Sequence, residues 1–114
     1  MGKSYSLERI RSFIGNNETA LLELAILFVK LAPENLESLK EGLDKKDYDT
    51  VGFYAHKLKS SIDSFEIKEL MTDIRTIENN AKKRSSVEDL PVLVSKLETV
   101  VHTVIREIKK DFKL

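Results

Sequence analysis

Residues 47–64 read DYDTVGFYAHKLKSSIDS. Apolar residues recur in this stretch at intervals of four, three and four, which is the spacing of one face of an α-helix. They are Val51, Ala55, Leu58 and Ile62. Asp47 stands one turn before the first of them, where its carboxylate can accept a hydrogen bond from a free N–H group at the start of a helix. The stretch therefore predicts an amphipathic helix that begins at Asp47 and buries one face.

The segments on both sides repeat this helical spacing. Upstream, the apolar residues are Leu21, Leu24, Ala25, Phe28 and Leu31, followed beyond Pro33 by Leu36, Leu39 and Leu43. Downstream, they are Ile67, Leu70, Met71, Ile74 and Ile77, and then Leu93, Leu97, Val100, Val104 and Ile108. Pro33 has no N–H group to donate, so we expect either one long kinked helix or two abutting helices around it.

Cap residues set the boundaries of these helices. Ser6 can cap a short N-terminal helix that stops near Gly15, and Asn17 can cap the next one. Pro91 belongs in a first helical turn, so the last helix is predicted to start at Asp89. No segment alternates with a period of two long enough to predict a sheet. Short connections between the helices predict an all-α fold, an antiparallel up-down-up-down four-helix bundle with a short additional N-terminal helix.

Length and composition narrow the possible functions. The chain has 114 residues, 41% of them hydrophobic, which suits one domain spanning residues 1–114. Nineteen basic residues balance nineteen acidic ones, so no overall field attracts nucleic acid or an anionic membrane. The sequence has no cysteine and no long apolar run, and we expect no signal peptide because its first residues are polar. We expect a cytoplasmic monomer that recognises its partners through a local patch.

His56 is predicted to face solvent. On a helical wheel it lies about 130° from the centre of the apolar face. The strip of surface around it is predicted to comprise Gly52, Phe53, Lys57, Lys59, Ser60 and Asp63. Glycine in a helix interior is less favourable than alanine by about 1 kcal/mol, so its presence at position 52 needs an explanation. We expect that the missing side chain lets a partner approach His56 closely.

The residue types in this strip suit phosphoryl transfer. An imidazole near its ordinary pKa of about 6.5 is largely neutral at pH 7, so a ring nitrogen can attack phosphorus. Lys59, one turn away, can stabilise the charge on the phosphoryl oxygens. The same spacing also fits an ordinary solvated helix face, and the spacing alone favours that interpretation.

The run Ala55-His56-Lys57-Leu58-Lys59-Ser60-Ser61 resembles the phosphoacceptor motif A-H-x-L-K-G-S of histidine-containing phosphotransfer (HPt) domains. The family also tends to have an aspartate where this helix starts, as at Asp47, and an acidic, Leu-rich helix with a central Phe upstream, as around Phe28. The resemblance covers nearly the entire chain. Ser60 stands where the family usually has glycine, and Glu66 stands where a second glycine often ends the motif.

The resemblance implies a phosphocarrier without kinase activity of its own. His56 would be phosphorylated on the nitrogen farther from the backbone, and Lys59 would assist. The implied partners are response-regulator receiver domains and a hybrid sensor histidine kinase. No cofactor is expected in this chain, because the receiver supplies the Mg²⁺ ion. No Gly-rich phosphate loop is present in the sequence, in line with this expectation.

Other interpretations fit the same residues. A helical adaptor could bind a receiver or another signalling protein through the same surface without chemistry. Asp63, two turns from His56, could raise the imidazole pKa unless Lys57 or Lys59 offsets its charge. His102 is predicted to be a surface residue on the last helix, and the two histidines give no support to a metal site.

Overall fold

The computed structural model describes residues 3–114, and helices make up most of them. The helices are α1 (Glu8–Ile14), α2 (Glu18–Asp44), α3 (Tyr48–Ser64), α4 (Lys68–Lys83), the single 3₁₀ turn η1 (Val87–Asp89) and α5 (Leu90–Phe112). No strand occurs within these described residues. The prediction of an all-helical protein is confirmed.

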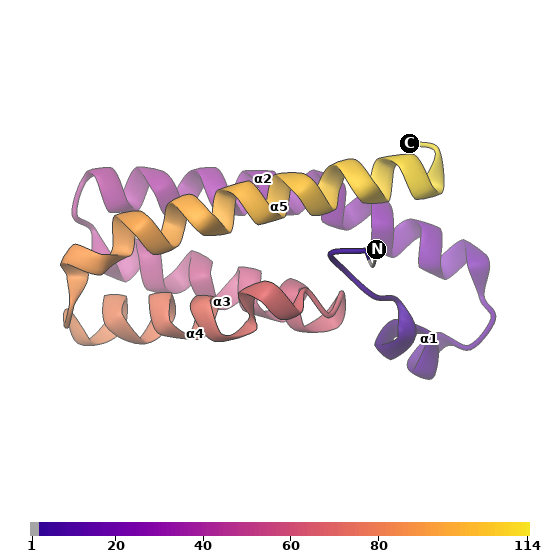
Figure 1. Cartoon of the computed structure of the whole chain (residues 1–114), viewed down its shortest axis with the longest axis horizontal. Helices are drawn as coiled ribbons and strands as arrows, with labels where there is room; N and C mark the ends of the chain where they lie inside the picture. The colour runs from indigo at the N-terminus through magenta and orange to yellow at the C-terminus, as the bar shows by residue number, and fades with distance from the viewer. Residues whose placement is uncertain (1–2) are drawn as a thin grey trace.

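The four long helices lie side by side along the long axis of the molecule (Figure 1). The colour gradient in Figure 1 runs in one direction along α2 and α4 and in the opposite direction along α3 and α5. The contacts join α2 to both α3 and α5, and α4 to both α3 and α5. The short helix α1 lies at one end, beside the N-terminal half of α2 (Figure 1).

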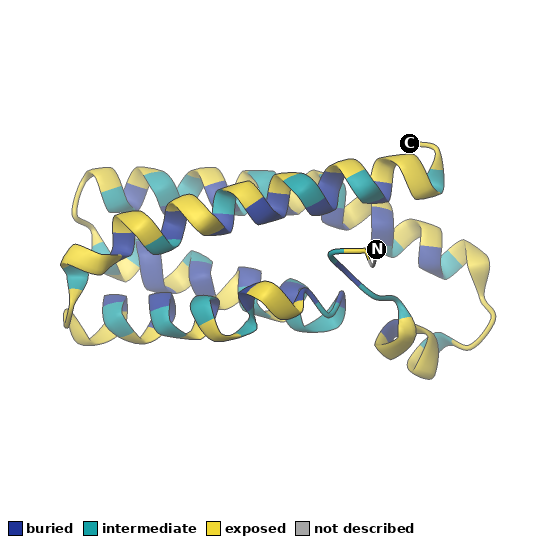
Figure 2. Ribbon diagram, viewed as in Figure 1, coloured by how far each residue is buried: buried dark blue, intermediate teal, exposed yellow. Residues whose placement is uncertain are grey.

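The core consists of the apolar stripes of the long helices, which face inward as dark bands in Figure 2. On α3, the predicted core residues Val51, Ala55, Leu58 and Ile62 are all fully buried. Leu31 is an exception to the predicted stripes, because 43% of its surface is exposed. Leu31 lines an apolar groove together with residues of α1 and α3.

The predicted caps of α2 and α3 are confirmed. For α1 the prediction is off by one residue, because Leu7 occupies the N-cap position while the Ser6 hydroxyl oxygen accepts a hydrogen bond from the Glu8 N–H at 3.2 Å. The Asn17 side chain accepts a hydrogen bond from the Ala20 N–H at 3.0 Å, and α2 then continues through Pro33 as one helix. Asp47 accepts hydrogen bonds from both the N–H (3.2 Å) and the hydroxyl (2.7 Å) of Thr50. These bonds satisfy donors at the start of α3 and fix where the helix carrying His56 begins.

Glu66 lies in the turn between α3 and α4, between Phe65 and Ile67, and has a left-handed conformation with φ of 48°. Glycine adopts this conformation without strain, which explains why a glycine is suited to the position that Glu66 occupies here. The glutamate side chain has a contact that glycine would lack, because its Oε1 accepts the Arg9 N–H at 2.8 Å. The Ser6 N–H also donates to the Phe65 carbonyl at 2.8 Å. Together these bonds hold the start of α1 against the α3–α4 turn.

Within residues 3–114, no helix has both the length and the apolar character needed to cross a membrane. In the same part of the chain, no three or more of the usual metal-ligating side chains gather at one place.

Candidate functional site

His56 lies on the outer face of α3, and 59% of its side chain is exposed. Its orientation follows from the helix itself, because Ala55 and Leu58 on either side are fully buried in the core. The sequence-based placement of this histidine at the surface is therefore correct.

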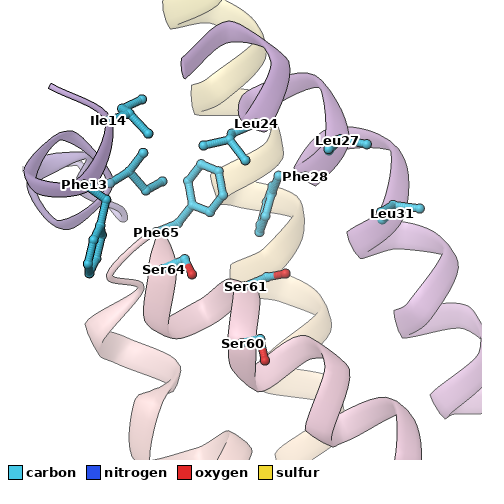
Figure 3. Close-up of a pocket in the computed structure, with 11 residues that line it drawn as sticks. Phe13, Ile14, Leu24, Leu27, Phe28, Leu31, Ser60, Ser61, Ser64 and Phe65 are labelled. Atoms are coloured by element: carbon cyan, nitrogen blue, oxygen red, sulfur yellow. The ribbon is translucent and has the colours of Figure 1, made fainter. Parts of the chain in front are cut away.

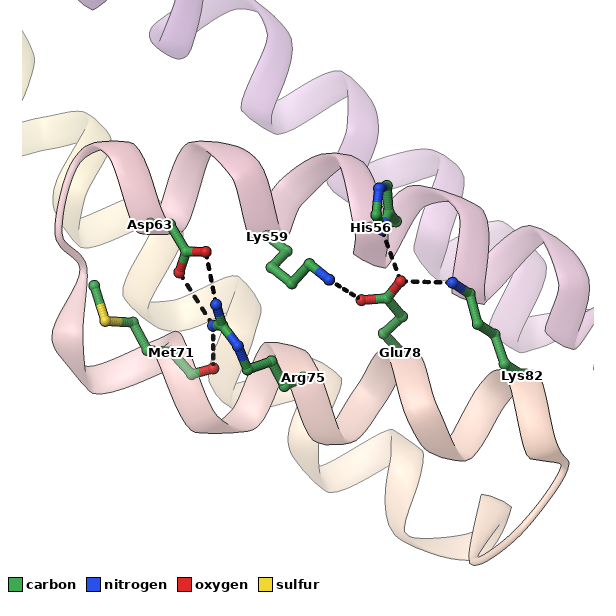
Figure 4. Close-up of polar contacts among 7 residues, drawn as sticks. All are labelled: His56, Lys59, Asp63, Met71, Arg75, Glu78 and Lys82. Carbon is green, nitrogen blue, oxygen red and sulfur yellow. Dashed lines mark hydrogen bonds and ion pairs between the residues drawn. The ribbon is translucent and has the colours of Figure 1, made fainter. Parts of the chain in front are cut away.

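A buried carboxylate on α4 contacts His56. Glu78 is only 5% exposed, and its Oε2 lies 2.8 Å from His56 Nδ1 and 2.7 Å from Lys82 Nζ. Its other oxygen, Oε1, lies 2.8 Å from Lys59 Nζ. Figure 4 shows the three side chains converging on this carboxylate. We call Glu78, His56, Lys59 and Lys82 the Glu78 cluster.

The charge state of Glu78 determines which nitrogen of His56 carries the proton. Burial raises the Glu78 pKa, but hydrogen bonds from Lys59, Lys82 and His56 outweigh this effect and lower the pKa to about 2. At neutral pH the carboxylate is ionised and can only accept hydrogen bonds, so His56 Nδ1 must donate one. In the neutral ring, the unprotonated nitrogen is then Nε2, the one farther from the backbone.

Lys59 lies one turn from His56, as predicted, and 26% of its side chain remains exposed. Its ammonium group pairs with Glu78. The paired position holds it beside the imidazole.

The prediction that Gly52 belongs to the exposed strip is wrong. Gly52 is buried, because the stem of Lys82 from α4 lies across it. A Cβ atom built at this position would lie 3.2 Å from Lys82 Cγ and 3.8 Å from Ala81 Cβ. The missing side chain therefore makes room for a lysine of the same chain, and does not open the surface to a partner.

The charge of Asp63 is compensated by Arg75 of α4. The Arg75 guanidinium group donates to both oxygens of the Asp63 carboxylate, at 3.1 Å and 2.7 Å (Figure 4). This geometry compensates the charge of Asp63. Lys57 and Lys59 are directed elsewhere: Lys59 pairs with Glu78, and Lys57 Nζ lies 4.8 Å from the centre of the Phe53 ring.

An apolar groove of about 330 Å³ lies on the other side of α3. Figure 3 shows how α1, α2 and the last turns of α3 enclose it. Its exposed apolar side chains are Phe13 (79%), Leu27 (49%) and Leu31 (43%). Ser60, one turn after His56, lines the groove and is itself exposed. The groove therefore begins one helical turn from His56, and no residue of α4 lines it.

Sequence reasoning missed Glu78, Lys82 and the groove. One signal for Glu78 was present: it falls within the apolar stripe of α4, between Ile77 and Ala81, where an acidic residue is out of place. A carboxylate on a buried face needs a partner, and His56 was the exposed candidate on a neighbouring helix. The structure places His102 on the exposed face of α5, outside the Glu78 cluster.

Comparison with protein-family models identifies a family for this chain. The family model described as "Hpt domain" matches residues 23–107, which include all four members of the Glu78 cluster. No curated protein and no solved structure matched the chain significantly.

Proposed function

Because the chain belongs to the Hpt domain family, we propose that His56 accepts a phosphoryl group from a receiver-domain aspartate and passes it to another receiver. The observation that supports this most directly is the contact between His56 Nδ1 and the ionised Glu78. It leaves Nε2 unprotonated on a side chain that is more than half exposed.

The transfer step follows from this tautomer. The lone pair of Nε2 forms a bond to phosphorus as the bond between phosphorus and the aspartyl oxygen breaks. The electrons of that bond leave with the aspartate carboxylate. Nδ1 keeps its proton against Glu78, whose negative charge stabilises the positive charge that develops on the ring. Reversal of the same step returns the phosphoryl group to a second receiver.

Lys59 supplies positive charge for the transferred group. Phosphoryl transfer gains most from positioning and electrostatic stabilisation of the equatorial oxygens. Lys59 is near the ring and has enough exposure to turn toward them. A Mg²⁺ ion, in this proposal, comes with the receiver and not with this chain.

The surfaces on either side of His56 differ in a way that suits a receiver domain. On the α4 side lie ammonium groups, which complement the acidic site that a phosphorylated aspartate and its Mg²⁺ ion require. On the α2 side lies the apolar groove, which can bury an apolar surface of the partner. Phe53, 54% exposed and in contact with Lys57, extends the contact area beyond His56.

Incubation with a phosphorylated receiver tests the proposal. We expect an acid-labile, base-stable phosphate on the wild-type chain and on a His102→Gln control, and none on His56→Gln. Since His102 and His56 are both exposed, neither substitution should disturb the core. Binding of the receiver without any transfer would contradict the proposal and would support a non-catalytic adaptor that uses the same surface.

A further inference from the structure

Lys82 occupies a position in the Glu78 cluster that the proposed transfer step leaves without a role. It lies on α4, one turn after Glu78, and its ammonium group contacts the same oxygen atom as His56 Nδ1. The lysine and the imidazole are therefore neighbours through this shared atom. Yet 56% of the Lys82 side chain is exposed, so its end can turn toward another anion nearby.

The charges of the cluster are unbalanced. One carboxylate faces two ammonium groups, which leaves one positive charge uncompensated beside the imidazole. A phosphoryl group on Nε2 would bring negative charge to this place. The excess positive charge of the cluster would attract this phosphoryl group once it is on His56.

The backbone beneath Lys82 is adapted to it. Gly52 is buried under the lysine stem, and any Cβ there would press on Lys82 Cγ at 3.2 Å. Glycine in the middle of a helix costs about 1 kcal/mol relative to alanine, so the chain gives up some stability of α3 at the position where Lys82 crosses it.

From these contacts we propose that Lys82 is a second phosphoryl-binding residue beside Lys59, and that Glu78 holds both ammonium groups near His56 until a phosphoryl group on Nε2 becomes their partner. The inference rests on the proposed function for the identity of the anion. It adds a residue outside the motif around His56, and it assigns Gly52 the role of accommodating the lysine.

A small-molecule phosphoryl donor tests the inference without any receiver. With phosphoramidate, the phosphorus–nitrogen bond of the donor breaks as the bond from Nε2 forms, and ammonia leaves. The initial rate of phosphohistidine formation is measured for the wild type, Lys82→Gln, Lys82→Arg and Lys83→Gln. Lys83 is the matched control, because it is the exposed neighbour of Lys82 and is not among the cations that contact Glu78.

We expect Lys82→Gln to slow formation about three- to tenfold, Lys82→Arg to restore most of the rate, and Lys83→Gln to have no effect. Nitrogen-15 spectra of the lysine ammonium groups give a second readout, in which Lys82 and Lys59 shift on phosphorylation and Lys83 does not. Gly52→Ala should slow formation as well, while its unfolding temperature stays equal or rises.

Unchanged rates in Lys82→Gln, together with an unshifted Lys82 signal, would overturn the inference. So would a wild-type His56 that accepts nothing from phosphoramidate. If Lys82 matters with phosphoramidate but no receiver transfers to His56, the inference stands and the proposed function fails. The two proposals can therefore be judged separately.

Discussion

Replacing Glu78 by glutamine should make the chain less stable at neutral pH and should remove part of its sensitivity to acid. The glutamine side chain has nearly the same shape, so the change removes the charge and leaves the packing. The loss arises because Lys59, Lys82 and His56 all contact the ionised form of this carboxylate.

The lowered pKa of Glu78 gives the magnitude of the effect. The fall from 4.5 to about 2 corresponds to about 3 kcal/mol, since each pKa unit is worth about 1.4 kcal/mol. Water around the exposed parts of Lys82 and His56 screens their contribution, so we expect about 1–3 kcal/mol at pH 7. Because the folded-state pKa lies below the unfolded one, this stability is present above pH 4.5 and is lost as the pH falls toward 2.

Urea unfolding between pH 3 and pH 7 measures the effect. The free energy of unfolding is compared for the wild type, Glu78→Gln and Glu41→Gln, an exposed glutamate on α2 that serves as the control. The other carboxylates titrate in all three proteins, so their contributions cancel when the free energies of unfolding are subtracted. The difference in the free energy of unfolding between the wild type and Glu78→Gln should decrease steadily below pH 5. A difference that stays constant from pH 7 to pH 3 would refute the conclusion that ionised Glu78 pairs with Lys59, Lys82 and His56.

Four further predictions concern the fold and the proposed partner surface. Gly42→Ala should lower the free energy of unfolding by about 1–3 kcal/mol, because the new Cβ would lie 2.8 Å from Thr50 Cγ2; an unchanged urea midpoint would contradict this. Asp47→Ala removes the cap of α3 and should cost about 1 kcal/mol, which the same assay measures. Phe13→Ser should weaken receiver binding by calorimetry about tenfold with little change in stability, since Phe13 is 79% exposed; equal affinity would exclude the groove as a docking surface. Lys59→Ala should slow transfer from a phosphorylated receiver about tenfold or more and leave the circular dichroism spectrum helical, whereas an unfolded variant would show that the lysine is structural.

Much of the fold could be predicted from local patterns. The apolar stripe of α3 and the caps at Asn17 and Asp47 depend on neighbours within one or two helical turns, so periodicity was enough to find them. Leu31 was misjudged because its exposure depends on whether another helix covers that flank of α2. That question concerns distant parts of the chain, and spacing within one helix does not answer it.

In the candidate site, too, the positions of residues within one helix could be predicted, whereas contacts between helices could not. His56 and Lys59 share one helix, so their relative position followed from 3.6 residues per turn. Glu78 and Lys82 come from α4, and only the pairing of α3 with α4 brings them to the imidazole. Gly52 was misplaced for this reason as well, since the lysine stem that buries it belongs to the other helix.

The Glu78 cluster and the apolar groove share α3, but each also uses helices that the other does not. The Glu78 cluster is built from α3 and α4, whereas Phe13 stands on α1, whose start is tied to the rest of the chain by Glu66. If a receiver docks in the groove as proposed, substitutions in α1 would change which protein binds without altering any charge around His56. Two related chains with the same Glu78 cluster but different first helices could then serve separate signalling pathways in one cell. The pathways would be kept apart by partner binding, with no change in the reactivity of His56.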